Sequence, residues 1–309
     1  MRVFVTGGTG LIGRRLVSTL CSRGDHVVLL TRSTSRAAPC DPDVIVQQGD
    51  PTVPGEWQSI AAQCEVVINL AGENLLARRW NTEHKARVRE SRLQATRNVV
   101  EAIRRSEGRC RTLVSASAIG YYGSRGDEVI DETTGPGSDF LAEVCKAWEN
   151  EAAGAARWGA RVVCVRIGVV LDPDGGALAH MIPAFRRFVG GPIGSGRQWM
   201  SWIHVDDLVD VFCRAIDDRG LSGPVNATAP TPVTNCRFAS CLGRAMCRPS
   251  VFRMPAFMLR LLLGEASSVI LSSQRVLPKV LLTRDHRFRF DNLNAALDDL
   301  LGQAAPRNV

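Results

Sequence analysis

The stretch VFVTGGTGLIG, residues 3–13, places a glycine cluster between an apolar strand-like segment and an amphipathic helix-like segment. Gly7, Gly10 and Gly13 form G-x-x-G-x-x-G, and Gly8, Gly10 and Gly13 also satisfy G-x-G-x-x-G. Without side chains the turn can tighten, and backbone N–H groups at the helix N-terminus can approach a diphosphate, which the helix dipole also favours. Strand, turn and helix follow in the order that the motif requires, so a plain glycine turn is the weaker interpretation.

Outward from this turn, short β-branched segments alternate with helix-like segments, which is typical of a parallel sheet wrapped by helices. The predicted strands are continuous apolar runs, as expected where both faces of a sheet are covered, and they span 2–6, 26–31, 44–47, 65–70, 111–115 and 161–167. The helices predicted between them span 11–22, 57–62, 82–105 and 140–157. The predicted fold class is α/β, a Rossmann-type doubly wound parallel sheet with a smaller, mostly helical C-terminal substrate lobe.

The pattern becomes irregular after Gly168. A helix is predicted over 177–189, a glycine-rich loop over 190–196, and a helix from His204 onward. Later helical segments are predicted near 236–246, 256–263 and 293–300. We therefore predict a Rossmann-type dinucleotide-binding domain over residues 1–233, of which 171–203 contribute to the substrate lobe, and a small, mostly helical domain over 234–305.

The end of the second predicted strand selects between dinucleotides. An acid at this position would bind the ribose hydroxyls of NAD, but the chain has Thr31-Arg32-Ser33. Arg32 can form a bidentate ion pair with the 2′-phosphate of NADP. A solvated surface arginine is the alternative, because arginine is abundant in this chain. The sequence favours NADP over NAD.

Other strand ends supply further candidates for the cofactor site. Asp50, past the third strand, is expected at the adenine, and Leu70-Ala71-Gly72, at the end of the fourth strand, at the ribose and nicotinamide. Gly72 would allow close backbone approach, although an ordinary turn glycine is the alternative. The predicted site also includes Gly7, Thr9, Gly10, Leu11, Ile12, Gly13, Ser33 and Ile167.

Four motifs carry a resemblance that covers nearly the whole chain: TGGTGLIG (6–13), NLAGEN (69–74), SASAIGYYG (115–123) and GGPIGSGRQWMSWIHVDDL (190–208). They resemble the atypical extended short-chain dehydrogenases/reductases known as epimerase-family proteins, which carry a small C-terminal domain of unknown role. The resemblance implies the extended fold and the use of NADP. It leaves the physiological substrate open.

Typical relatives use a Ser-Tyr-Lys group, in which the lysine follows the tyrosine by four residues. Lys146 matches the lysine, but Ala142 stands at the tyrosine position and cannot transfer a proton. This departure puts a standard dehydrogenase or epimerase mechanism in doubt.

The chain has only two tyrosines, Tyr121 and Tyr122, just beyond the fifth predicted strand. Because ligands bind at the carboxyl ends of parallel strands, we hypothesise that Ser117 polarises a substrate carbonyl and that Tyr121 or Tyr122 donates a proton. Lys146 would bind the nicotinamide ribose, as part of both the catalytic and the cofactor site. The alternatives are that the tyrosines only wall the pocket and that Lys146 is a helix-surface lysine.

The substrate side is predicted from two segments. The glycine-rich loop leads into Arg197, Trp199 and Trp202, a combination that suits closure over a small organic ligand. Glu73 and Asn74, after the fourth strand, are expected near the same ligand. A flexible surface loop with tryptophans as core anchors is the alternative.

Composition narrows the partners. The net charge is +7, but basic residues are spread along the chain without a patch interleaved with aromatics, so no nucleic-acid partner is predicted. The apolar run 254–271 is interrupted by Arg260 and Glu265, so no spanning helix and no membrane partner are predicted. The 10 cysteines are scattered singly and the 5 histidines lie far apart, which indicates a cytoplasmic protein with no metal site. A small-molecule substrate is expected, and a homodimer is left open.

These features favour an NADP-dependent oxidoreductase that acts on a small carbonyl or alcohol compound. A sugar-nucleotide epimerase-like enzyme and a catalytically weak NADP-sensing binding protein remain the alternatives.

Overall fold

The computed structural model describes residues 1–37, 44–75 and 78–302. The chain divides into two compact units, each assembled from several segments. Unit 1 comprises Met1–Tyr121, Ser138–Arg166 and Val209–Val225, and unit 2 comprises Tyr122–Gly137, Ile167–Leu208 and Asn226–Val309. The two adjacent tyrosines therefore belong to different units.

Unit 1 is built around a seven-stranded sheet with the order β11-β7-β5-β4-β1-β2-β3. The strands are β1 (Arg2–Thr6), β2 (His26–Thr31), β3 (Ile45–Gln48), β4 (Val66–Asn69), β5 (Thr112–Ala118), β7 (Arg161–Ile167) and β11 (Gly223–Ala227), the last two of which end in unit 2. β1 pairs in parallel with both β2 and β4, and β3 and β5 extend the sheet in parallel on either side. Because the strand order reverses at β1, its carboxyl end lies where open α/β sheets bind ligands.

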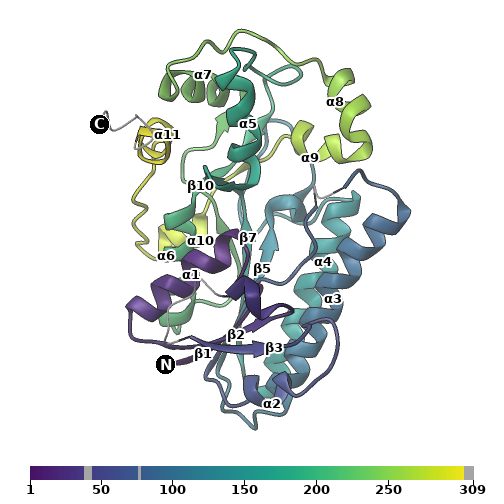
Figure 1. The fold of residues 1–309 in the computed structure, drawn as a ribbon, viewed down its shortest axis with the longest axis vertical. Helices are drawn as coiled ribbons and strands as arrows, with labels where there is room; N and C mark the ends of the chain where they lie inside the picture. The colour runs from purple at the N-terminus through teal and green to yellow at the C-terminus, as the bar shows by residue number, and fades with distance from the viewer. Residues whose placement is uncertain (38–43, 76–77, 303–309) are drawn as a thin grey trace. The chain divides into compact units, whose positions relative to one another are not determined.

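Helices cover both faces of this sheet. Figure 1 shows α3 (Thr82–Arg104) and α4 (Phe140–Ala153) together on one side, and α1 (Leu11–Ser22) and α6 (Val205–Asp217) on the other. α2 (Trp57–Ala61) is joined to the α3 side through a core that includes Phe4, Trp57, Val67, Val99 and Leu113. The predicted Rossmann-type α/β fold is confirmed, and β1, β2, β7 and α1 have the predicted bounds residue for residue.

Two features of unit 1 differ from the prediction. β11 was not predicted because its sequence, GPVNA, contains glycine and proline, which are tolerated at the edge of a sheet. α4 was predicted to reach Arg157, but its α-helical part ends at Ala153 and a 3₁₀ helix, η3 (Gly154–Trp158), follows. A glycine at this junction explains the tighter turn, because glycine weakens an α-helix.

Unit 2 contains short strands and helices around a separate core. The helices are α5 (Gly176–Arg186), α7 (Asn235–Ala245), α8 (Ala256–Leu263), α9 (Ser267–Leu271), α10 (Lys279–Thr283) and α11 (Leu293–Gly302). Paired strands are β8 (Val169–Asp172) with β10 (Trp202–His204), β9 (Trp199–Met200) with β12 (Val233–Thr234), and β6 (Val129–Ile130) with β13 (Arg275–Val276). The core includes Leu178, Phe185, Trp202, Phe238 and Leu297. These strands were not predicted, because segments of two to four residues show no usable periodicity.

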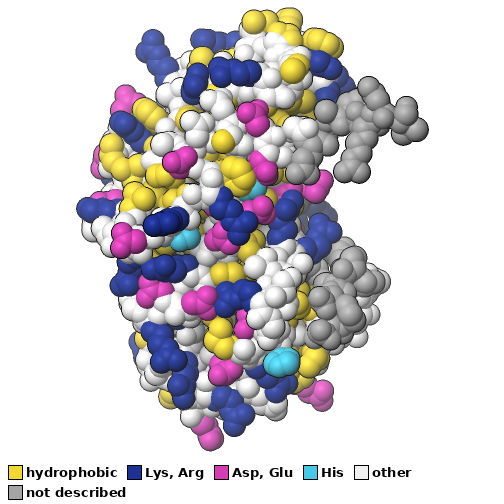
Figure 2. All heavy atoms as spheres, turned by 90° about the vertical axis from the view of Figure 1, so that its left-hand side faces the viewer, with side chains coloured by type: hydrophobic (Ala, Val, Ile, Leu, Met, Phe, Trp, Pro, Cys, Tyr) yellow, Lys and Arg dark blue, Asp and Glu magenta, His cyan; other side chains and the backbone are white. Residues whose placement is uncertain are grey.

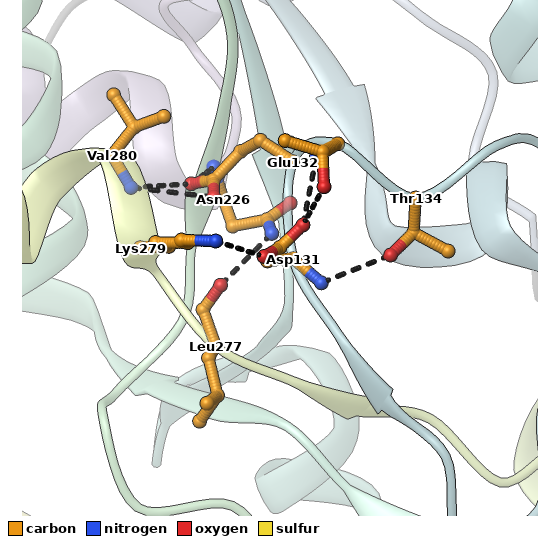
Figure 3. A network of polar contacts seen from close by, with 8 residues as sticks. Asp131, Glu132, Thr134, Asn226, Leu277, Lys279 and Val280 are labelled. Atoms are coloured by element: carbon orange, nitrogen blue, oxygen red, sulfur yellow. Dashed lines mark hydrogen bonds and ion pairs between the residues drawn. The ribbon is translucent and has the colours of Figure 1, made fainter.

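Within unit 2, a polar network links the residues directly after β6 to the start of α10 (Figure 3). Lys279 Nζ lies 2.8 Å from Asp131 Oδ2, and this ion pair lowers the pKa of Asp131 to about 2. The neighbouring Glu132 accepts hydrogen bonds from the backbone N–H groups of Asn226 and Val280. Burial raises the pKa of Glu132. The network fixes Asn226, which matters for the interpretation of Tyr122.

On the face shown in Figure 2, Lys and Arg side chains lie among Asp and Glu side chains, so the charge of this face is mixed. No helix that the structure describes is both long and apolar enough to cross a bilayer. The absence of a nucleic-acid partner stays a prediction.

Candidate functional site

The glycine turn after β1 is packed so closely that side chains would not fit. Gly7 has a φ of +70°, and a Cβ there would lie 2.7 Å from the carbonyl carbon of Leu70. A Cβ on Gly13 would lie 2.4 Å from the carbonyl oxygen of Gly7. The turn therefore sits directly on the end of β4, and the first turn of α1 sits directly on the glycine turn. This is the close approach that the motif predicts.

The N-terminus of α1 lacks the side-chain cap that the long helices α3 and α4 have. Asn81 caps α3 by accepting a hydrogen bond from the His84 N–H, and Asp139 caps α4 by accepting one from the Ala142 N–H. α1 begins at Leu11 directly after Gly10, which has no side chain to cap the helix, and its first turn contains no acidic residue. Its backbone N–H groups and the helix dipole are therefore available to an anion such as a diphosphate. The residues present fit a dinucleotide.

The other predicted cofactor residues lie around this turn or at neighbouring strand ends. Arg32 is exposed directly after β2. Ser33 exchanges hydrogen bonds with Thr31. Asp50 Oδ1 accepts hydrogen bonds from the backbone and the hydroxyl of Thr52. Thr9, Leu11, Ile12, Leu70 and Ile167 are half-buried, Ala71 is buried and Gly72 is exposed; their contact with a cofactor stays a prediction.

Arg92 was not predicted, yet it supports the end of β4. A Cβ on Gly72 would lie 3.1 Å from Arg92 Cζ, so the glycine permits close contact with this guanidinium. Arg92 Nη1 donates to the Glu73 carbonyl oxygen at 3.0 Å, and its guanidinium lies 5.2 Å from the Trp148 ring centroid. Burial lowers the pKa of Arg92. Arg92 therefore holds the backbone of the NLAGEN segment, residues 69–74, in place.

A buried chain of hydrogen bonds joins β1, β4, α3 and α4. Thr6 Oγ1 donates to Asn69 Oδ1 at 2.7 Å, and Asn69 Nδ2 donates to Thr96 Oγ1 at 2.9 Å. Trp148 Nε1 donates to the same Thr96 oxygen at 2.8 Å. Satisfied buried networks of this kind rigidify a core. The two strand ends that flank the glycine turn are therefore fixed to each other.

A second polar cluster lies at the end of β5. Ser117, which is buried, donates from Oγ to Glu149 Oε1 at 2.6 Å. Arg166 Nε and Nη2 each lie 2.8 Å from a carboxylate oxygen of Glu149, which is the bidentate geometry of an ion pair. The side chain of Arg166 is only 4% exposed. A serine is thus hydrogen-bonded to a carboxylate that a buried guanidinium holds in place.

Tyr121 completes this cluster. The Cζ atom of Arg166 lies 3.5 Å from the centroid of the Tyr121 ring, which is the geometry of a cation–π contact. Ser117, Tyr121, Glu149 and Arg166 all belong to unit 1. Of the predicted catalytic residues, the structure therefore brings Ser117 and Tyr121 to one cluster.

The face of α4 that meets this region carries no proton-transferring tyrosine or lysine. A Cβ on Gly120 would lie 3.4 Å from Leu141 Cβ and 3.8 Å from Cys145 Sγ. Leu141, Cys145 and Glu149 recur every four residues, so they form one stripe along the helix. Lys146 is exposed, and its predicted contact with the nicotinamide ribose stays a prediction. Burial raises the pKa of Cys145 to about 12, so its thiol stays protonated and is a poor nucleophile.

Tyr122 has a different environment from Tyr121. Its ring is completely buried, and its hydroxyl donates to Asn226 Oδ1 at 2.7 Å. Asn226 is held by its own bond from Nδ2 to the Leu277 carbonyl oxygen (Figure 3). The phenol of Tyr122 is thus part of the internal polar network of unit 2, which favours Tyr121 over Tyr122 as a proton donor.

The predicted substrate residues of the loop after α5 lie in unit 2. Trp202 is fully buried in the core, where its Nε1 donates to the Thr231 carbonyl oxygen. Trp199 is half-buried and donates from Nε1 to Asp127 Oδ1 at 2.8 Å. Arg197 is exposed. Trp202 therefore acts as a core anchor, whereas Trp199 and Arg197 keep accessible atoms.

The glycine-rich loop itself is held by backbone contacts. A Cβ on Gly191 would lie 2.3 Å from the Phe252 carbonyl oxygen, and the Gly194 N–H donates to the Met254 carbonyl oxygen at 2.8 Å. The glycines thus serve close packing, which differs from the mobility expected from the sequence. Glu73 is half-buried and Asn74 is exposed, and both stay substrate predictions.

Glu149 and Arg166 were missed by sequence reasoning. Glu149 lies on a helix among other acids, and Arg166 is one of many arginines. Two features of the sequence could have indicated them. Glu149 follows Leu141 and Cys145 at four-residue spacing, and Arg166 is a charged residue inside the apolar run 161–167. A charge within a strand that is buried on both faces needs a partner.

Two segments of the chain match known protein families. A model described as the NAD dependent epimerase/dehydratase family matches residues 3–227, and a domain of unknown function, DUF1731, matches residues 254–300. The chain belongs to the NAD-dependent epimerase/dehydratase family. This confirms the resemblance seen in the motifs.

Individual members of the epimerase family match over almost the full length. The chain is 43% identical to the "Epimerase family protein SDR39U1 homolog, chloroplastic" of Arabidopsis thaliana over 304 residues, covering 96% of this chain and 86% of the relative. It is 35% identical to the epimerase family protein YfhF of Bacillus subtilis over 302 residues, covering 97% and 98% of the two chains.

Solved structures of the epimerase family agree with this assignment. The crystal structure of human epimerase family protein SDR39U1 (isoform2) with NADPH matches with a TM-score of 0.85 at 34% identity, covering 98% of this chain and 99% of that chain. A nucleoside-diphosphate sugar epimerase from Corynebacterium glutamicum matches with a TM-score of 0.77 at 35% identity, and covers 98% of this chain but 58% of that one.

Proposed function

We propose that this protein is an NADPH-binding oxidoreductase that acts on a small carbonyl or alcohol compound. The observation that carries the proposal is the uncapped N-terminus of α1 above a glycine turn that is closed to any side chain. The human relative that was crystallised with NADPH supports the choice of cofactor. Arg32, exposed at the end of β2, would bind the 2′-phosphate.

When bound, NADPH would supply the hydride for a carbonyl carbon, and the protein must handle the proton on the oxygen. The Ser117 hydroxyl donates a hydrogen bond to Glu149, so the lone pairs of Ser117 Oγ can accept a hydrogen bond from a substrate hydroxyl. In the oxidative direction the alcohol proton would pass to Ser117 Oγ as the serine proton passes to Glu149. The reverse transfer would protonate the oxygen of a carbonyl. This serine–glutamate relay would replace the missing tyrosine.

The phenol of Tyr121 is the rival proton donor in the same cluster. Its ring is fixed by Arg166, which also holds Glu149. Lys146, exposed on α4, would need to extend along the helix to reach a ribose. A cytoplasmic location is part of this proposal, because ten scattered cysteines suit a reducing compartment.

Two other functions are each supported by one observation. A sugar-nucleotide epimerase-like activity is supported by the name of the Corynebacterium relative, and it predicts a cofactor that is transiently reduced and copurifies without exchange. A catalytically weak NADPH-sensing protein is supported by Ala142, which is buried on α4 at the position where typical relatives carry the proton-transferring tyrosine. It predicts binding without turnover.

The experiment measures the oxidation of NADPH, through its absorbance, in the presence of each compound of a carbonyl panel. It compares the wild type with Ser117→Ala, Glu149→Gln and Tyr121→Phe. We expect turnover to fall by roughly 10²- to 10⁴-fold in the first two variants, as for loss of a general acid–base group. A similar loss only in Tyr121→Phe would assign proton transfer to the tyrosine. Wild-type binding without turnover on any carbonyl would contradict the oxidoreductase assignment.

A further inference from the structure

An exposed apolar surface lies on unit 2, in the segment that contains α8. Its large apolar side chains are all more than a third exposed: Val251, Phe252, Met254, Phe257, Met258, Leu261 and Leu262. Phe257 is 68% exposed, Leu261 73% and Leu262 63%. Soluble monomers rarely expose contiguous apolar patches, and those that they do expose usually mark interaction sites. We call residues 251–262 the α8 surface.

The orientation of α8 explains why these side chains project outward. Leu259 is buried, and Ala256 and Leu263, three residues before and four after it, are half-buried, so this row faces the unit. Phe257 and Leu261 form a neighbouring row four residues apart, and Met258 and Leu262 form another. Figure 1 shows α8 as a short helix next to α9 at the periphery of the unit. The apolar side chains of both rows are exposed to solvent.

A second segment extends the α8 surface. Phe188 and Val189 are about half exposed. The Phe252 N–H donates to the Gly190 carbonyl oxygen at 3.3 Å, so this segment runs beside residues 251–254. Arg248 Cζ lies 4.6 Å from the centroid of the Phe188 ring.

The charged residues within the α8 surface are of one sign. Between Asn226 and Gly264 the sequence of unit 2 contains no acidic residue and five arginines, Arg237, Arg244, Arg248, Arg253 and Arg260, and Glu265 is the first acid after α8. Arg253 and Arg260 are exposed within the surface itself, and Arg186 and Arg187 are exposed directly before Phe188. Protruding aromatic and aliphatic side chains among arginines are typical of segments that lie in a membrane interface. Two copies of such a basic surface would repel each other.

We propose that the α8 surface binds peripherally to an anionic lipid surface. Phe257, Leu261 and Leu262 would enter the headgroup–acyl boundary, and Arg253 and Arg260 would contact lipid phosphates while their aliphatic stems stay near the apolar layer. The interruption of 254–271 by Arg260 and Glu265 argues only against a spanning helix. A peripheral contact needs no uninterrupted apolar run, and this proposal departs from the prediction of no membrane partner made from the sequence.

The test is sedimentation of the full-length protein with vesicles of phosphatidylcholine alone and of phosphatidylcholine with phosphatidylglycerol. We expect binding to the anionic vesicles only, with weaker binding at higher salt because each arginine–headgroup attraction is screened. The triple variant Phe257→Ser, Leu261→Ser, Leu262→Ser is expected to reduce the partition coefficient at least about tenfold. Arg253→Glu with Arg260→Glu should have an effect of similar size.

The matched control is Val53→Ser, which removes an apolar side chain that is 57% exposed in unit 1. It should sediment like the wild type, and all variants should keep the wild-type unfolding temperature because the altered side chains are exposed. Equal binding to both vesicle types, wild-type binding by the triple variant, or no binding at low salt would each overturn the proposal. Concentration-dependent self-association that the triple variant abolishes, without vesicle binding, would assign the surface to a second copy of the chain.

Discussion

The turn after β1 and the turn after β5 lie at carboxyl ends of strands in one sheet, but they relate differently to the family pattern. After β1 every glycine that the motif requires is present, and the packing leaves no space for a side chain. After β5 the expected tyrosine–lysine pair on α4 is incomplete, because Ala142 stands at the tyrosine position, and a Ser117–Glu149–Arg166 cluster lies in this region. Cofactor binding is therefore expected to depend on backbone geometry, whereas any chemistry must depend on side-chain contacts that the family's tyrosine–lysine spacing does not predict.

The largest loss of stability in the β5 region is expected for Glu149→Ala. It leaves Arg166 buried and without its carboxylate, which should destabilise the protein by about 3–5 kcal/mol. Chemical denaturation measures this loss. Glu151→Ala on the same helix is the control, because its partner Arg97 is 63% exposed and such pairs contribute about 1 kcal/mol or less. Equal effects of the two variants would contradict the view that Glu149 is the anchor of the cluster.

The corresponding change in the β1 region is Gly13→Ala. Its Cβ would meet backbone atoms at 2.4 Å, which cannot move aside without opening the turn. We expect a cost of about 1–3 kcal/mol in unfolding free energy and a loss of NADPH affinity of at least about tenfold. Gly154→Ala is the control, since its Cβ would make an ordinary 3.7 Å contact with Val100 and should change stability by less than about 1 kcal/mol. Unchanged affinity in Gly13→Ala would show that the turn does not hold the cofactor.

The two tyrosines after β5 should differ in how much each hydroxyl contributes to stability. Tyr122→Phe removes a buried hydrogen bond to Asn226 and should cost about 1–2 kcal/mol, with turnover unchanged. Tyr121→Phe keeps the ring that Arg166 contacts, so it should leave stability within about 0.5 kcal/mol. Thermal unfolding and turnover measured on both variants check this. Loss of turnover in Tyr122→Phe without loss of stability would contradict the structural role of Tyr122.

The smallest expected effect is the acid sensitivity of the network in Figure 3, which holds the partner of Tyr122. Lys279 lowers the pKa of Asp131 from 3.8 to about 2. Because the folded pKa is the lower one, this pair stabilises the protein above pH 4 and its contribution is lost as the pH falls toward 2. Lys279 is 59% exposed, so solvent screens this ion pair and its effect on stability should be the smallest of those predicted here. Asp131→Asn should lower stability at pH 7 but not at pH 2, and an equal loss at both pH values would contradict the assignment.

The sequence predicted the β1 region well because that region depends on backbone geometry and local periodicity. Gly7, Gly10 and Gly13 can be recognised by spacing alone, and α1 and β2 follow from apolar runs of ordinary length. The β5 region depends on contacts between distant segments: Ser117 meets Glu149 across 32 residues, and Arg166 lies 17 residues further along the chain. No local pattern encodes such a pairing. Lys146 matched the family spacing, but the stripe on α4 that faces Gly120 carries its neighbour Cys145.

The most direct test of the central claim is a calorimetric titration of NADPH and NADH into the wild type and Arg32→Ala, with Arg89→Ala as an exposed-arginine control. We expect the wild type and the control to bind NADPH roughly 10- to 100-fold more tightly than NADH, and Arg32→Ala to lose this preference while still binding both dinucleotides. Failure of the wild type to bind either dinucleotide, or an unchanged preference in Arg32→Ala, would contradict it.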